Sequence, residues 1–180
     1  MTAIAVLPVT SDRWADLAAL FGTSGVMRGC WCMWPRTPYG QMHTGAANER
    51  RLRAIVEGGT SPGLLAYADG TPAGWCSVGP RPHFGRFFDE RADCDVWLIA
   101  CLFIAESHRG LRVGSHLIDA AVRHAAEHGA RRIEALPRGW RPDDDPDTLD
   151  RLIRAFRGAG FVPQIEAGGP ARLVRSLTDG

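Results

Sequence analysis

The feature that most constrains the fold is a run of nine consecutive apolar residues, Val96 to Ile104. The run is rich in branched and aromatic side chains, and it is well short of the ~18 residues that a membrane-spanning helix requires. Such a run is typical of a central β-strand that is buried on both faces. A strand of that kind needs packing on both sides, so the chain is predicted to form a layered fold of strands and helices.

The rest of the chain divides into segments of strand and helix periodicity, with no repeat or linker between them. Helices are predicted where apolar residues recur every three or four positions, and strands where they are continuous or alternate. The fold class is therefore α/β (α+β), a mixed sheet with helices on both faces, in one domain spanning residues 1–180. The predicted strands are residues 4–9, 64–68, 73–78, 96–104, 131–136, 161–162 and 172–177; the predicted helices are residues 11–22, 46–57, 113–128 and 146–160; residues 35–45 and 80–91 are predicted long loops.

Turn and cap residues set several of these boundaries. The pair Asp69-Gly70 supplies the positive φ angles that a two-residue hairpin turn requires. Ser11 is predicted to cap the first helix and Gly22 to end it. Asp145, followed by proline, has the position of an N-cap before the last helix.

Composition and charge exclude several classes of protein. The formal net charge is +1 and no lysine- or arginine-rich run is present, so the basic surface that binds nucleic acid is not expected. The first ten residues lack the basic segment and the small-residue cleavage site of a secretory signal, and no run is long enough to span a membrane. A cytoplasmic protein with no nucleic-acid or membrane partner is therefore expected.

The five cysteines are expected to be reduced thiols. An odd number cannot pair completely, and Cys76 and Cys101 lie within apolar segments, where a thiol behaves as a small hydrophobic group. Cys30 and Cys32, with His43 not far beyond, raise the alternative of a zinc site. Because the three lack the paired C-x2-C and H-x3-5-H spacings of zinc sites, no metal is predicted.

A small-residue loop, residues 106–115, joins the apolar strand to the next helix and opens directly into the helix N-terminus. The free N–H groups of a first helical turn and the helix dipole attract anions, and glycines let a phosphate approach the backbone. The ending of a Walker loop and the G-x-G-x-x-G of a dinucleotide fold are both missing from it. The loop therefore predicts a phosphate-bearing ligand of another kind, with a nucleotide-binding fold as the alternative.

The strand and loop together resemble motif A of the GNAT N-acetyltransferase superfamily. That motif is a strand followed by Arg/Gln-x-x-Gly-x-Gly/Ala, and this chain has Leu-Phe-Ile at residues 102–104 and Arg-Gly-Leu-Arg-Val-Gly-Ser at residues 109–115. The element order agrees over nearly the whole chain, and Phe156 with Gly160-Phe161 resembles the family's aromatic-x-x-x-Gly-Phe ending. The segments at residues 28–32 and 74–78 are similar to those of a bacterial subgroup whose substrates are unknown.

The resemblance implies an N-acetyltransferase with a mixed, mostly antiparallel central sheet. Acetyl-CoA would be the cosubstrate and no metal would be needed. The acceptor would be a primary amine of a small molecule or peptide, acetylated by direct transfer, and a homodimer is left open. In the family the strand holds the pantetheine arm and the loop cradles the pyrophosphate. The implied cofactor-binding residues are Leu102, Phe103, Ile104, Arg109, Gly110, Leu111, Arg112, Val113, Gly114 and Ser115.

Two positions depart from the family pattern. Arg112 stands where the motif usually has its first glycine, so the backbone must tolerate a side chain there, and the guanidinium could itself meet a phosphate. Phe156 stands where many members carry a tyrosine thought to protonate the leaving thiolate. Because Phe156 belongs to an apolar helical stripe, it is predicted to pack in the core rather than to contact the thioester.

Four residues near the central strand are candidates for the base that removes the amine proton: Asp93, Asp95, Glu106 and His108. Asp95 is the candidate catalytic residue, because a carboxylate that serves as base or holds a water often lies just before this strand in the family. Carboxylates at strand starts are also commonly only solvated. Cys101 has no histidine partner in the sequence and lies in mid-strand, so packing is predicted for it rather than an acyl-cysteine.

The candidate substrate-binding residues are Trp31, Trp34 and Trp75, which with Arg28 and Arg36 could form an aromatic pocket wall. Core packing beneath a long loop explains these tryptophans at least as well. Acidic runs at residues 89–95 and 143–145 could attract a cationic amine, although solvation and helix capping explain most such runs.

A rival function from another class is a regulatory module that keeps the acyl-CoA cleft and transfers nothing. Acetyl-CoA binding combined with thiol release in the presence of amines separates the two functions, because only an enzyme shows both.

Overall fold

The computed structural model describes residues 2–23, 29–41, 43–136, 146–164 and 172–178. Its centre is a seven-stranded sheet with the strand order β1-β2-β3-β4-β5-β7-β6. Only the β4–β5 pair is parallel and the other five pairs are antiparallel, so the predicted mixed sheet is confirmed. The elements in chain order are β1 (Ile4–Pro8), α1 (Trp14–Thr23), α2 (Ala46–Glu57), β2 (Gly63–Ala68), β3 (Thr71–Pro80), β4 (Val96–Ile104), α3 (Val113–Glu127), β5 (Arg132–Ala135), α4 (Pro146–Gly158), β6 (Val162–Gln164) and β7 (Arg172–Ser176).

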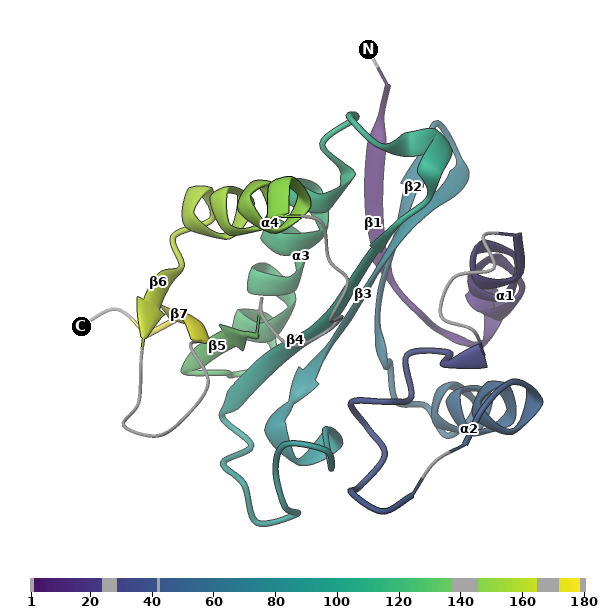
Figure 1. Ribbon diagram of the computed structural model, residues 1–180, viewed down its shortest axis with the longest axis horizontal. Coiled ribbons are helices and arrows are strands. Elements are labelled where there is room, and N and C mark those ends of the chain that lie inside the picture. Colours follow the sequence, from purple (N-terminus) through teal and green to yellow (C-terminus); the bar gives the residue numbers. More distant parts are fainter. Residues whose placement is uncertain (1, 24–28, 42, 137–145, 165–171, 179–180) are drawn as a thin grey trace.

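Helices cover both faces of the sheet, as predicted: α3 and α4 lie on one face and α1 and α2 on the other (Figure 1). The first face is closed by a core cluster that includes Leu117 and Ile118 of α3 and Phe156 of α4. The second face is closed by a cluster around Leu17 and Trp75. Within the described residues, no helix combines the length and the apolar character that a bilayer crossing demands.

The start of the first helix differs from the prediction. Residues Ser11–Arg13 form a 3-10 turn that leads into α1, and the residue at the N-cap position is Thr10, without a side-chain cap. Ser11 is therefore not the cap. Gly22 lies inside α1 rather than after it, because the helix runs to Thr23. Asp145, the predicted cap of α4, lies outside the described residues, as do Arg28 and residues 143–144.

A bulge and a separation of two strands position the site. On β3, Ser77 faces Cys101 of β4 and Val78 faces Ile99, so Ala100 is the extra residue of a β-bulge. On its other side, β4 pairs with β5 only from Val96 to Ile99. From Ala100 onward β4 leaves β5, and among the described residues no strand pairs with the side of β4 that faces β5. The second half of the central strand therefore presents a backbone edge between the bulge and α3.

Candidate active site

The loop between β4 and α3 is an exposed turn that ends at an uncapped helix. Residues 106–108 form a short 3-10 turn, and residues 109–112 are exposed. Gly110 has a φ of 88°, which glycine adopts without strain. No side chain caps the N-terminus of α3, so its first-turn N–H groups remain for an acceptor from outside the helix. This arrangement suits an anionic ligand.

Arg112 is the residue that directly precedes α3, with φ 59° and ψ 18°. This is the left-handed region, which costs a residue with a side chain about 1–2 kcal/mol. The conformation gives a physical reason for the glycine that the family pattern has at this position. This chain adopts the same backbone conformation with an exposed arginine.

Two further loop residues leave room for a ligand. Arg109 makes an exposed ion pair with Glu106 at 3.5 Å, a kind of contact that adds little stability and can be exchanged for a stronger anion. Gly114 is the second residue of α3, and a Cβ added there would meet only the Ile104 Cδ1 atom, at 3.9 Å. The backbone at Gly114 is therefore open on the side where a Cβ would project.

The side chains of the predicted strand residues alternate between the two cores. Leu102 and Ile104 are half-buried and pack against the α3 side of the sheet, and Phe103 is buried on the α1 side. Because both faces are packed, the backbone edge toward β5 is the part of these residues that a ligand could reach in the described part of the chain. The free backbone edge of residues 102–104 thus continues directly into the predicted phosphate loop.

The three candidate tryptophans have different environments. Trp75 is fully buried and donates its indole N–H to the Cys32 Sγ atom at 3.1 Å. Trp31 stacks on Trp14, with ring centroids 5.9 Å apart. Trp34 is 39% exposed and is the one of the three whose ring lies at the surface. Packing accounts for Trp75 and Trp31, whereas Trp34 is placed where a substrate could reach it.

Burial favours the protonated form of three thiols, those of Cys30, Cys32 and Cys76. Burial raises the pKa of Cys32 well above its ordinary value, and nearby Cys101 raises it further. Burial likewise raises the pKa values of Cys76 and Cys30. Cys101 itself packs with the second-face core. Among the described residues, no group of three or more His, Cys, Asp and Glu side chains is arranged to hold a metal ion.

Arg36 is 92% buried, since only 8% of its surface is exposed. One terminal nitrogen, Nη2, donates to the Pro62 carbonyl at 2.6 Å and lies 3.4 Å from the Ser77 Oγ atom. The guanidinium also lies over the Phe84 ring, 4.7 Å from its centroid. Arg36 lines an open depression of about 710 Å³ between residues 36 and 38 on one side and residues 82 and 85–90 on the other.

Glu134 on β5 is a buried carboxylate that the sequence analysis missed. Only 1% of it is exposed, and its oxygens accept from Arg81 at 2.7 Å, from Arg132 at 2.9 Å and from Arg172 at 3.3 Å. These arginines come from the segment after β3 and from β5 and β7. The available signal was a glutamate between two apolar strand residues, Ile133 and Ala135, a position at which a carboxylate needs cationic partners.

The candidate bases are spread along β4. Asp95 is exposed at the start of the strand, where its carbonyl accepts from the Arg131 N–H at 2.8 Å. At roughly 3.3 Å per residue, the nine-residue strand separates Asp95 from the loop by about 30 Å. Asp93 pairs with Arg131 beside it. Glu106 and His108 lie in the loop itself.

His83 was not among the predicted bases, and it is near enough to Arg36 for the charge of that guanidinium to act on its ring. Its Nδ1 atom is within 3.2 Å of where a Cβ on Gly79 would stand, so the ring covers β3. Partial burial lowers the pKa of His83, and the charge of Arg36 lowers it further. The imidazole is therefore neutral near pH 7 and able to accept a proton.

A model of the acetyltransferase (GNAT) family matches residues 29–161, which is most of the chain. The chain therefore belongs to the GNAT family of acetyltransferases, as the motif and the element order predicted. No curated protein sequence matches it significantly.

Solved structures share the fold over nearly their whole length, at low sequence identity. The candidate acetyltransferase yncA of Salmonella typhimurium, with its cofactor acetyl-CoA, is 14% identical with a TM-score of 0.60, covering 99% of this chain and 96% of that one. Diaminobutyrate acetyltransferase EctA of Paenibacillus lautus, with L-2,4-diaminobutyric acid and coenzyme A, is 12% identical with a TM-score of 0.59, covering 100% and 99%. A Drosophila melanogaster polyamine N-acetyltransferase is 14% identical with a TM-score of 0.56, covering 97% and 100%.

Proposed function

We propose that the protein transfers an acetyl group from acetyl-CoA directly to a primary amine of a small molecule or peptide. The observation that carries this proposal is the open backbone edge of β4, which runs from the bulge at Ala100 to an uncapped helix. A ligand with an extended polar arm and a pyrophosphate fits such a path. Acetyl-CoA has both parts, and it carries the activated acetyl group that the reaction requires.

The phosphate end is assigned to residues 109–115. Gly110 and Arg112 hold the left-handed turns that lead into α3, and the Gly114 backbone is open on its outer side. First-turn N–H groups and the helix dipole favour a pyrophosphate there. Arg109 would exchange its exposed contact with Glu106 for a phosphate oxygen, which binds a guanidinium more strongly.

The pantetheine arm is assigned to the backbone of Leu102, Phe103 and Ile104. An extended ligand can add to a free strand edge as a further strand, through main-chain hydrogen bonds. The edge ends at Ala100, where β4 and β5 meet, so the acetyl group would lie near the bulge. The thioester carbonyl would then be within reach of backbone donors that stabilise its developing negative charge.

Direct transfer is favoured over an acyl-cysteine intermediate by the state of the thiols. A thiolate is the reactive form of cysteine, and burial keeps Cys32 and Cys76 protonated. The amine must instead lose a proton and attack the thioester itself, which requires orientation and a base. Asp95 stays the predicted base. In that role it could act only on an amine that approaches the thioester from the start of β4. The neutral His83 is a second candidate, because its imidazole can accept a proton and is within range of the charge of Arg36.

Structural relatives support an amine acceptor and leave its kind open. The Paenibacillus enzyme has L-2,4-diaminobutyric acid as its substrate, an amine with a carboxylate, and the Drosophila enzyme forms N-acetylagmatine from an amine without one. The same fold thus serves both kinds of amine. The acceptor of this chain has to be inferred from its own side chains, including Trp34 at the surface.

Two measurements test the proposal. Calorimetry should show micromolar binding of acetyl-CoA and no binding of ATP or NAD. Release of free coenzyme A thiol should then depend on an added amine, in a panel of amino acids, polyamines and peptide N-termini. Acetyl-CoA binding without amine-dependent thiol release would favour a regulatory module, and ATP or NAD binding alone would contradict the assignment of the loop.

A further inference from the structure

Five arginines of the described residues differ in how their positive charge is neutralised. Arg81, Arg132 and Arg172 all share the buried carboxylate of Glu134. Arg36 and Arg86 make no ion pair with any carboxylate among the described residues. The two without an anion both line the depression between residues 36–38 and 82–90.

Of the two arginines without an anion, Arg36 gives the stronger indication of an anion-binding site, because its charge is buried. Removing a charge from water costs several kcal/mol unless a partner compensates for it. Among the described residues, the compensation consists of one backbone carbonyl, one hydroxyl and the face of Phe84, and the buried Nε atom has no hydrogen-bond partner there. Burial lowers the pKa of Arg36 to about 10, and the group remains cationic at neutral pH. A buried cation without an anion in a pocket wall marks a binding site for an anion.

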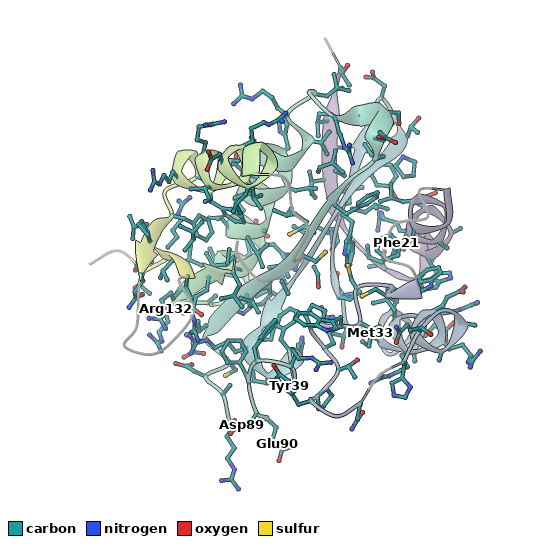
Figure 2. The ribbon with its side chains drawn as sticks, viewed as in Figure 1. Phe21, Met33, Tyr39, Asp89, Glu90 and Arg132 are labelled. Atoms are coloured by element: carbon teal, nitrogen blue, oxygen red, sulfur yellow. The ribbon has the colours of Figure 1, made fainter. Side chains whose placement is uncertain are left out.

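The wall opposite Arg36 is held in place by a second arginine. Arg86 lies between the rings of Trp34 and Tyr39, 5.1 Å and 4.7 Å from their centroids, and its backbone N–H donates to the Pro35 carbonyl at 3.1 Å. Phe87 packs edge-on against Trp34. Figure 2 shows Tyr39, Asp89 and Glu90 toward the lower edge of the molecule. The residues that line the depression include two arginines, Arg36 and Arg86, two aromatic residues, Phe87 and Phe88, and two acidic residues, Asp89 and Glu90.

Arg36 also lies at the level of the sheet where the reaction would occur. Its guanidinium is 3.4 Å from the Oγ atom of Ser77, and Ser77 pairs with Cys101, the first residue after the bulge. At the same level β4 and β5 separate after the pair Ile99 and Ala135. An anion on Arg36 would thus be a short distance from the end of the open edge.

We propose that this depression binds the acceptor through a carboxylate held by Arg36, so that the substrate is a small amino acid or another amine that carries a carboxylate. This inference rests on the proposed acetyltransferase function. A guanidinium binds a carboxylate through two parallel hydrogen bonds, which orients the bound molecule as well as attracting it. Asp89 and Glu90 at the rim repel a doubly charged phosphate and favour a zwitterion with one carboxylate and one ammonium group. The volume of about 710 Å³ suits a small molecule.

The test compares amino acids with their carboxamides as acceptors, in wild type and in Arg36→Met. Wild type should acetylate carboxylates with the higher kcat/KM. Arg36→Met should lower kcat/KM for carboxylates roughly 10- to 100-fold, mainly through KM, and change it less than about threefold for the carboxamides. Amidation also lowers the pKa of a neighbouring amine, so the informative quantity is the variant-to-wild-type ratio for each acceptor. A purely structural role of Arg36 would reduce both ratios equally.

Two controls keep the test decisive. Arg53→Met removes an exposed arginine of α2 that pairs with Glu57, and it should leave both ratios unchanged. Arg36 also holds its loop against the Pro62 carbonyl, so Arg36→Met could disturb the fold. Folding of the variant is checked by calorimetric binding of acetyl-CoA. If Arg36→Met does not bind acetyl-CoA, Arg36→Lys is used in its place. Lysine keeps the charge and loses the paired geometry, so a partial loss confined to carboxylates is expected.

The outcomes separate the two proposals. Equal variant-to-wild-type losses for carboxylates and carboxamides overturn the carboxylate site and leave the acetyltransferase function standing. Failure of every amine to release thiol, despite acetyl-CoA binding, overturns the proposed function and the carboxylate site with it.

Discussion

Arg112 combines an exposed side chain with a left-handed backbone, which makes its two roles separable. Arg112→Gly relieves the backbone cost and should raise the free energy of unfolding by about 1 kcal/mol. If the guanidinium binds a phosphate, the same change weakens coenzyme A binding but not binding of dephosphorylated pantetheine. Urea denaturation and calorimetry measure the two effects. Equal losses for both ligands would contradict a contact between the guanidinium and a phosphate.

A substitution at Gly114 is likewise expected to affect protein stability and ligand binding differently. An alanine there has space in the ligand-free protein, since its nearest neighbour would be Ile104 Cδ1 at 3.9 Å. Gly114→Ala should therefore keep or raise stability, by up to about 1 kcal/mol. Acetyl-CoA binding should fall roughly 10-fold or more, because the methyl group occupies the side from which a phosphate approaches. Normal binding by a folded Gly114→Ala protein would mean that the loop is only a turn.

Phe156 is fully buried and packs edge-on against Phe161, with centroids 5.0 Å apart. The predicted core role is confirmed, and no phenol is present at this position to protonate the leaving thiolate. We expect kcat/KM to rise with pH and then level off, controlled by deprotonation of the amine. A bell-shaped profile that loses its upper limb when another Tyr, Cys or His is replaced would reveal a substitute acid.

At the scale of elements, local signals predicted most of the fold. Asp69 and Gly70 have φ angles of 46° and 83°, as a tight hairpin between β2 and β3 requires. The limits of α2 and β4 agree with the predicted residues. Ser11 failed as a cap because a 3-10 turn, which needs no side-chain cap, precedes α1. Helix and strand types follow from neighbours in sequence, whereas the first turn of a helix also depends on tertiary packing.

The candidate site was only partly predictable, for a related reason. The phosphate loop follows from residues that are adjacent in sequence. The bulge at Ala100 depends on the register between β3 and β4, which sequence periodicity does not reveal. Arg36 reaches Ser77 across 41 residues, and Arg81 reaches Glu134 across 53. Contacts between residues so far apart in the sequence form only when the chain folds. The structure, and not the sequence, therefore distinguishes the arginines that have a carboxylate partner from those that have none among the described residues.

The last turns of α3 carry a titratable cluster. His124 and His128 lie four residues apart, with ring centroids 4.2 Å from each other, and both contact Trp97. Burial, and then the charge of His128, lower the pKa of His124 below the ordinary value of 6.5. As the pH falls, His124 is protonated in the unfolded chain before it is protonated in the folded one. The stability that the neutral His124 contributes is therefore present above pH 6.5 and is lost as the pH falls toward the pKa of the folded state. Between about pH 7.5 and about pH 5.5, Tm should fall less in His124→Gln than in wild type; equal falls would contradict this.

At the scale of the whole molecule, Glu134 connects three segments that are distant in the chain. Glu134→Gln keeps the shape of the side chain but leaves Arg81, Arg132 and Arg172 without a shared anion in a buried site. The free energy of unfolding should fall by about 3–5 kcal/mol, the usual cost of breaking a buried ion pair from one side. Urea denaturation measures the loss. The exposed pair of Arg53 and Glu57 is the control, and Glu57→Gln should cost less than about 1 kcal/mol. Similar costs at the two sites would refute the connecting role.

The separation of β4 from β5 has a thermodynamic consequence. Unpaired strand edges expose backbone groups that attract other chains, and proteins usually cover them. Here, on the proposed function, the covering strand is a metabolite rather than a segment of the polypeptide, so the fold reaches its full complement of main-chain hydrogen bonds only in its presence. Binding to the folded state alone adds about 2.7 kcal/mol of stability at a ligand concentration 100 times Kd. The supply of acetyl-CoA would thereby set how long the protein survives heat and proteolysis, in addition to how fast it works.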